Sequence, residues 1–146
     1  MQIPVKLLRK LVALSKSERR TLISCFSVLL VVRIGLTVLG FRRLQRFIRP
    51  AHERAPLEIL QLTGWAIRHA ARLVPGASCL TQALAAQIML ARSGYGASLR
   101  VGVARTTAGN IRAHAWLTSG DFIIIGGDPD SLAEYSVFAG RLTPTA

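Results

Sequence analysis

The sequence predicts a domain of the α+β class, in which helices are followed by an antiparallel β-meander. Three observations predict this architecture. Apolar residues recur at helical spacing over residues 57–73 and 78–92. After Gly96 the hydrophobic period changes to two, which is typical of half-buried strands. About half of the 146 residues (51%) are apolar, which suits one hydrophobic core and excludes a disordered chain.

Both predicted helices have recognisable boundaries. The helix over 57–73 follows Pro56 and ends before Pro75-Gly76. For the helix over 78–92, Ser78 is the predicted N-cap and Gly94 follows the last turn. The first residue inside this second helix is therefore expected to be Cys79.

Three strands are expected after the helices, over residues 98–104, 111–118 and 122–125. In the second strand, Ala115 and Leu117 alternate with His114 and Trp116, so the latter pair shares the more polar face. Residues 119–121 are expected to form a three-residue hairpin turn. The tail, 130–141, is expected to form one short helix.

Positive charge is concentrated in the first part of the chain. The protein has 19 Lys and Arg against 7 Asp and Glu, a net charge of +12, and residues 1–56 carry +10 of it. Residues 57–146 are nearly neutral, at +2. We therefore expect a basic helical arm over 1–56, facing a partner or a membrane, and a separate, nearly neutral domain over 57–146.

Residues 21–40 form a run of 20 mostly apolar residues, after a predicted N-cap at Ser17. This length suits a bilayer-spanning helix, but Arg33 lies inside the run and both flanks are basic. The expectation is a helix that packs on the body or docks a partner protein. A helix lying on an anionic membrane and a membrane span both stay open.

Several classes of protein are excluded or disfavoured. Two distant cysteines, Cys25 and Cys79, make no disulfide framework. The histidines (His52, His69 and His114) are not spaced as zinc ligands, so we expect no metal and no cofactor. The basic arm lacks a nucleic-acid-binding motif, so no nucleic-acid partner is expected. The expected location is cytoplasmic, with membrane association left open.

Cys79 and His114 are the candidate catalytic pair. The first turn of a helix offers a positive dipole end and unpaired amides, which favour a thiolate and can stabilise an oxyanion. His114, 35 residues later, can accept the thiol proton and later protonate a leaving amine. The pair predicts nucleophilic catalysis on a carbonyl group.

Hairpin geometry selects a candidate for the acid that orients the histidine. With the three-residue turn, Thr118 would face Phe122 and His114 would face Gly126, with Asp128 the diagonal neighbour, about 7–8 Å away. Asp121, at the turn, would lie roughly 20 Å from His114 along the strand. Asp128 is therefore preferred, with Asp130 as the fallback.

These residues carry a resemblance to a known family. The order Cys, His, Asp resembles the transglutaminase-like branch of papain-fold enzymes, and residues 57–140 look like the leader peptidase of lasso-peptide biosynthesis, the protease part of the split B protein. The matching positions are Trp65, Cys79-Leu80, Ala83-Leu84-Ala85-Ala86-Gln87, Leu90, Ser93-Gly94, Val101-Gly102-Val103 and Ala113-His114-Ala115-Trp116. The basic, apolar N-terminal helix is similar too.

The resemblance implies a papain- or transglutaminase-like core in which the nucleophile helix packs on the β-meander. It implies Cys79 as nucleophile, His114 as base and Asp128 as orienting acid, in an enzyme that removes the leader from a ribosomally made precursor peptide. It also implies two partners, a leader-recognition protein and an ATP-dependent cyclase. The alternatives are an acyl transferase or transglutaminase on the same triad, and a non-catalytic basic adaptor for membranes or nucleic acid.

Overall fold

The computed structural model describes residues 15–49 and 51–137. In chain order its elements are α2 (Lys16–Val38), α3 (Phe41–Gln45), α4 (Leu57–Ala71), α5 (Cys79–Arg92), β1 (Ser98–Arg105), β2 (Ile111–Ser119), β3 (Phe122–Ile125), α6 (Pro129–Leu132) and β4 (Ser136–Val137). The α+β class, the two helices of the body and the first three strands are confirmed, with boundaries within one or two residues of those predicted.

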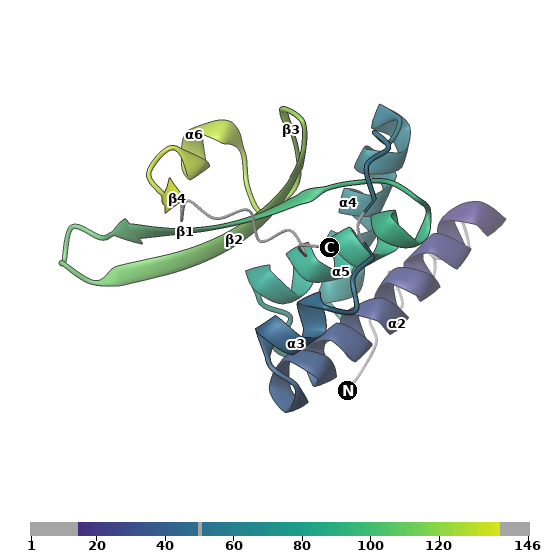
Figure 1. Ribbon diagram of the computed structural model, residues 1–146, viewed down its shortest axis with the longest axis horizontal. Helices are drawn as coiled ribbons and strands as arrows, with labels where there is room; N and C mark the ends of the chain where they lie inside the picture. Colours follow the sequence, from purple (N-terminus) through teal and green to yellow (C-terminus); the bar gives the residue numbers. More distant parts are fainter. Residues whose placement is uncertain (1–14, 50, 138–146) are drawn as a thin grey trace.

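The elements form a helical layer and a four-stranded antiparallel sheet of order β3-β2-β1-β4 (Figure 1). Helix α5 packs against β2, β1 and β3, whereas α4 packs against β3. Helix α2 crosses both α4 and α5 on the side away from the sheet (Figure 1). The β1–β2 hairpin extends beyond the helices.

Helix α2 starts two residues earlier than the sequence predicted. Its N-cap is Ser15, whose hydroxyl accepts from the Glu18 backbone N–H at 3.2 Å. The Glu18 carboxylate accepts from the Ser15 backbone N–H at 2.8 Å, which completes a capping box. The prediction of Ser17 as the cap is wrong, because Ser15 and not Ser17 has an acidic residue three positions later.

One face of α2 belongs to the hydrophobic core of the body. Cys25, Val28, Leu29 and Val32 are buried in the same cluster as Leu84 of α5. The helix is also long and apolar enough to cross a membrane, a property that core helices and signal sequences share. The described part of the basic arm thus packs on the body and leaves its other face exposed.

Strand β1 pairs with β2 over its whole length, with Gly102 opposite His114 and Val101 opposite Ala115. Ala115 and Leu117 belong to the core. His114 and Trp116 lie on the opposite face, as predicted from the alternation. Trp116 is buried, so this face is less polar than the sequence suggested.

The connection from β2 to β3 differs from the prediction. Ser119 still pairs with Phe122, so the turn holds two residues, Gly120 and Asp121, and not three. The pairing then shifts between Thr118–Ile123 and Leu117–Ile125, which leaves Ile124 as an extra residue, a β-bulge. The predicted register of Thr118 against Phe122 is therefore wrong.

The bulge is held by helix α4. The Ile124 carbonyl accepts from Arg68 Nη1 at 3.2 Å. Gly64, one turn earlier in α4, lies so close that a Cβ there would overlap the same carbonyl oxygen. A glycine in the middle of this helix, unfavourable for the helix itself, is thus explained by the close approach of β3.

After β3, Gly126 and Gly127 lead into the single-turn helix α6 and then the short strand β4, which pairs with β1. The sequence predicted one helix over 130–141. Its start is confirmed in α6, but residues 136–137 are a strand, and residues 138–141 lie outside the described part of the chain.

Candidate active site

Cys79 is the first residue of α5, where the sequence placed it. The Ser78 hydroxyl accepts from the Thr81 backbone N–H at 3.3 Å, and lies 3.0 Å from the Thr81 hydroxyl. The Gln82 backbone N–H is bonded to the Ser78 carbonyl. The amides of Cys79 and Leu80 come too early in the helix to have an acceptor within it, so they are suited to hold an anion.

The two cysteines lie in different environments. Cys79 is half-buried, at the N-terminal end of α5. Cys25 is completely buried in α2, and burial raises the pKa of its thiol to about 11. Cys25 is therefore a protonated core residue at neutral pH, and Cys79 is the accessible thiol.

His114 lies on β2 with its ring fixed by the backbone. Nε2 is hydrogen-bonded to the carbonyl oxygen of Gly126, the residue that directly follows β3. Since a carbonyl can only accept, Nε2 is the protonated nitrogen. In the neutral ring Nδ1 is then unprotonated, which is the state a general base requires.

Two aromatic side chains surround the His114 ring. The ring of Trp116 is stacked at a centroid distance of 6.1 Å, and Tyr135, between α6 and β4, is tilted at 5.3 Å. Trp116 and Tyr135 also contact each other, at 6.2 Å. One ring from β2 and one from the α6–β4 connection therefore restrict the motion of the imidazole.

Gly102 has no side chain, and Trp116 and Tyr135 occupy the space that a side chain there would need. It lies opposite His114 on β1. A Cβ at this position would come within 2.9 Å of Trp116 Cη2 and 3.0 Å of Tyr135 Cβ. Any side chain at 102 would push one of these rings away from the histidine.

Asp128, the predicted third member, is the N-cap of α6. Its carboxylate accepts from the Ser131 backbone N–H at 2.9 Å, and the Ser131 hydroxyl is 3.1 Å from the Asp128 backbone N–H. Of the two alternatives, Asp121 lies in the exposed β2–β3 turn and Asp130 in the exposed first turn of α6.

The structure brings the candidate residues to adjacent elements without hydrogen-bonding them to one another. Helix α5 packs on β2, and Asp128 is two residues from the carbonyl that holds His114. Within residues 15–49 and 51–137, no hydrogen bond joins Cys79 to His114, or His114 to Asp128. Catalytic hydrogen bonds are often long in the free enzyme and tighten with substrate.

Sequence reasoning missed two groups at this site. A backbone carbonyl has no side-chain signal, although the predicted register placed Gly126 opposite His114. Tyr135 had no signal in the sequence at all. Among the described residues, no three His, Cys, Asp or Glu side chains gather as a metal site.

Comparison with known protein families gives a match over most of the chain. The family model described as the transglutaminase-like superfamily matches residues 26–139, which begin within α2 and include every later element of the described chain. No curated protein and no solved structure matches the chain in the same comparisons.

Proposed function

The chain belongs to the transglutaminase-like superfamily, and from this premise we propose that it is a cysteine peptidase that removes the leader from a ribosomally made lasso-peptide precursor. The superfamily supports cysteine-based peptidase or acyl-transfer chemistry in general. The finer assignment rests on the resemblance of residues 57–140, above all Cys79-Leu80 and Ala113-His114-Ala115-Trp116, to leader peptidases.

One observation carries the proposal: an accessible thiol at a helix N-terminus occurs together with a histidine whose tautomer is fixed. Cys79 begins α5 beside two backbone amides without helical acceptors. The Gly126 carbonyl holds His114 with Nδ1 free to take a proton. These are the nucleophile and the base that acyl transfer requires.

In the proposed reaction, His114 Nδ1 takes the proton from Cys79 Sγ, and the thiolate attacks the carbonyl carbon of the scissile peptide bond. The Cys79 amide stabilises the oxyanion. The C–N bond then breaks, and the imidazolium protonates the departing amine, the new N-terminus of the core peptide. Water, deprotonated by His114, attacks the thioester and releases the leader as a carboxylic acid with the free thiol.

Asp128 is proposed to support this cycle through its negative charge. Because the Gly126 carbonyl already accepts from Nε2, the carboxylate favours the imidazolium without a direct hydrogen bond to the ring. Asp128 also caps the helix that follows the Gly126-Gly127 segment.

The proposed setting is the bacterial cytoplasm, in an antibiotic-biosynthesis route. A separate leader-recognition protein would present the precursor, and an ATP-dependent cyclase would close the macrolactam on the new N-terminus. Both partners are proposals that rest on the resemblance alone.

The deciding experiment incubates the full chain with precursor peptide and the leader-recognition protein, and follows products by mass spectrometry. Cys79→Ala should lower cleavage at least about 10³-fold, because it removes the nucleophile. Cys25→Ala, which removes the buried thiol, is the matched control and should still cleave. Retained cleavage by Cys79→Ala contradicts the proposal.

The same product masses test the alternative of an acyl transferase. If an amine and not water resolves the thioester, the leader fragment carries the mass of that amine. If neither product forms and neither Cys79 nor His114 affects any activity, the non-catalytic adaptor is the better account.

A further inference from the structure

We propose that the exposed side of α2, together with α3, binds the surface of an anionic membrane, with α2 lying in the plane of the interface. This inference is independent of the proposed peptidase activity. It rests on the side of α2 that the body does not cover.

The outer face of α2 is a single apolar stripe. We define it as Ile23, Ser27, Leu30, Val31, Ile34 and Val38, which recur at intervals of three, four, seven and eight residues. The five aliphatic side chains are between 42% and 72% exposed. From Ile23 to Val38 the stripe extends about 23 Å along the helix. A continuous exposed apolar strip of this length indicates a binding surface.

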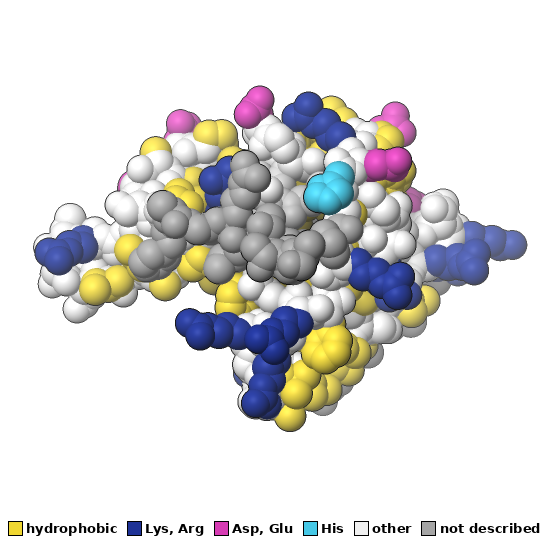
Figure 2. Space-filling model, in the orientation of Figure 1, with side chains coloured by type: hydrophobic (Ala, Val, Ile, Leu, Met, Phe, Trp, Pro, Cys, Tyr) yellow, Lys and Arg dark blue, Asp and Glu magenta, His cyan; other side chains and the backbone are white. Residues whose placement is uncertain are grey.

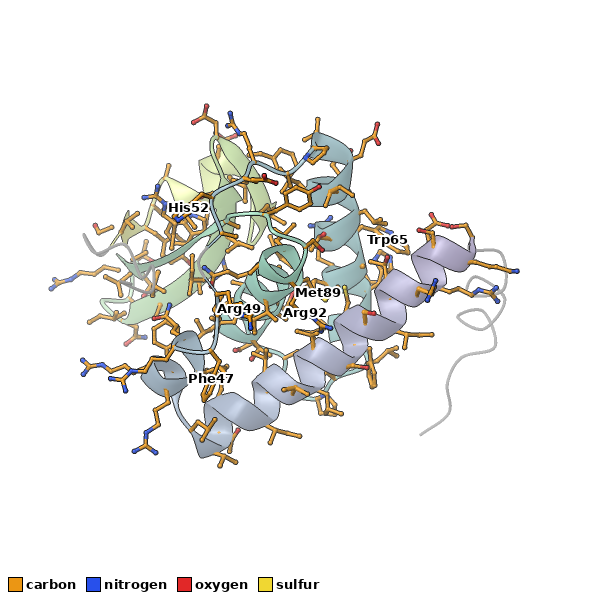
Figure 3. All side chains as sticks on the ribbon, turned by 45° about the vertical axis from the view of Figure 1, so that its right-hand side comes forward. Phe47, Arg49, His52, Trp65, Met89 and Arg92 are labelled. Atoms are coloured by element: carbon orange, nitrogen blue, oxygen red, sulfur yellow. The ribbon has the colours of Figure 1, made fainter. Side chains whose placement is uncertain are left out.

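Only the outer face of α2 is available to bind a membrane. Its opposite face, with Cys25, Leu29 and Val32, is buried against α4 and α5. A transmembrane orientation would have to separate that face from the core. A helix that keeps its inner face on the protein can bury its outer face only to the depth of the lipid interface. In Figure 3, α2 lies across the front of the other helices, with side chains projecting away from them.

Positive charge borders the stripe at both ends. Before it come the exposed residues Lys16, Arg19 and Arg20, and after it the exposed residues Arg42, Arg43, Arg46 and Arg49. The sole acidic residue within 15–49 is Glu18, and its carboxylate is bonded to the backbone of Ser15. In Figure 2 a basic cluster lies with hydrophobic side chains at the lower end of the molecule, while Asp and Glu side chains lie above. The charge complements anionic headgroups.

The polar groups of this surface favour lipid over an acidic protein. The Ser27 hydroxyl donates to the Ile23 carbonyl at 3.0 Å, and the Thr37 hydroxyl to the Arg33 carbonyl at 3.0 Å. The stripe and the neighbouring Thr37 thus present aliphatic groups and hydroxyls that are already bonded to their own helix. Protein partners are normally matched through directed hydrogen bonds, whereas a lipid interface requires none.

Phe47 extends the apolar surface beyond α3. It is 75% exposed, between the basic residues Arg46 and Arg49, and follows α3 in Figure 3. Aromatic rings among basic side chains are typical of the headgroup region of membranes. Within residues 15–49 and 51–137, most of this ring is left uncovered.

The test is co-sedimentation of the full chain with vesicles of phosphatidylcholine containing about one third phosphatidylglycerol, and with vesicles of phosphatidylcholine alone. We expect binding to the anionic vesicles to be at least about tenfold stronger, and to weaken when salt rises from about 0.1 M to about 0.5 M. The double variant Val31→Glu with Ile34→Glu should bind at least about tenfold more weakly.

Matched control variants distinguish the contribution of the α2–α3 surface to vesicle binding from general effects of charge and folding. Ile111→Glu makes the same change at a side chain that is 69% exposed, on the β1–β2 hairpin, and should bind like the wild type. Arg42→Gln with Arg43→Gln should weaken binding about tenfold, whereas Arg105→Gln with Arg112→Gln should not. Circular dichroism checks that each variant is folded, and Cys79→Ala should bind normally whether or not the chain is a peptidase.

Three results would overturn the proposal. The first is a folded wild-type chain that does not bind anionic vesicles, which would leave an acidic protein as the occupant to test. The second is equal binding to neutral vesicles. The third is unchanged binding by the α2 double variant.

Discussion

The imidazole of His114 donates from Nε2 to the backbone carbonyl of Gly126, just after β3. In the proposed mechanism a backbone group thus performs the orienting task that a side-chain acid commonly performs for a catalytic histidine. The bulge at Ile124 and the Gly126-Gly127 segment bring that carbonyl to the ring. The proposed mechanism therefore separates two roles: the Gly126 carbonyl fixes the tautomer, and Asp128 supplies negative charge.

Asp128→Asn should lower kcat/KM about 10- to 100-fold without changing stability. Asparagine is as good an N-cap as aspartate, so only the negative charge is lost. The expected loss corresponds to one charge interaction of about 1.4–2.7 kcal/mol near a protein surface. Steady-state kinetics and thermal unfolding measure the two quantities.

Asp128→Ala is the companion variant, because it removes both the charge and the cap. It should add about 1 kcal/mol of destabilisation to the same kinetic loss. Wild-type kinetics in Asp128→Asn would limit Asp128 to capping α6. A loss near 10⁴-fold would instead indicate direct hydrogen bonding of the carboxylate to the ring.

Tyr135 is expected to position His114. Tyr135→Ala removes the ring that lies 5.3 Å from the imidazole and should lower kcat about tenfold with little change in KM. Tyr135→Phe keeps the ring and should behave like the wild type. If the phenylalanine variant is equally impaired, the hydroxyl and not the ring matters, and the positioning role is wrong.

Gly64→Ala should destabilise the protein although alanine is the better helix former. The new Cβ would overlap the backbone carbonyl of Ile124, and overpacking of this kind costs about 1–3 kcal/mol. Gly35→Ala, also inside a helix, meets only the flexible end of Leu44 at 3.1 Å, so its effect on stability should be small. Urea unfolding compares the two, and equal effects would refute the close approach of α4 to β3.

The buried thiol of Cys25 should make stability fall at alkaline pH. Burial raises the pKa of Cys25 to about 11, whereas an unfolded cysteine titrates near about 8.5. Between these values the unfolded chain loses the proton first, so the free energy of unfolding falls by up to about 1.4 kcal/mol per pH unit. Unfolding of the wild type and of Cys25→Ala from pH about 8 to about 10.5 should give curves that converge as pH rises. Parallel curves would contradict a raised pKa of the Cys25 thiol in the folded protein.

The parts of the fold set by neighbouring residues could be predicted from the sequence. Ser78 caps its helix through a bond to Thr81, three residues away, so the position of Cys79 at the start of α5 was predictable. The alternation along β2 likewise separated His114 from Ala115 correctly.

Features that depend on distant contacts could not be predicted in this way. The Ile124 bulge is held by Arg68, 56 residues earlier, and it displaced the register from which Asp128 was chosen. Tyr135 reaches His114 only because β4 pairs back onto β1. Local periodicity carries no information on such contacts, so the environment of His114 was the least predictable part of the site.

The most direct test of the central claim is the alkylation of Cys79 by iodoacetamide near neutral pH, followed by peptide mapping and mass spectrometry. The account predicts that Cys79 is labelled in preference to Cys25, and that His114→Ala slows the labelling of Cys79 at least about tenfold while leaving the fold intact. The measurement is made on the protein alone and again with the precursor peptide and its recognition protein. If His114→Ala leaves the labelling rate of Cys79 unchanged under both conditions, an activated Cys79–His114 pair is contradicted.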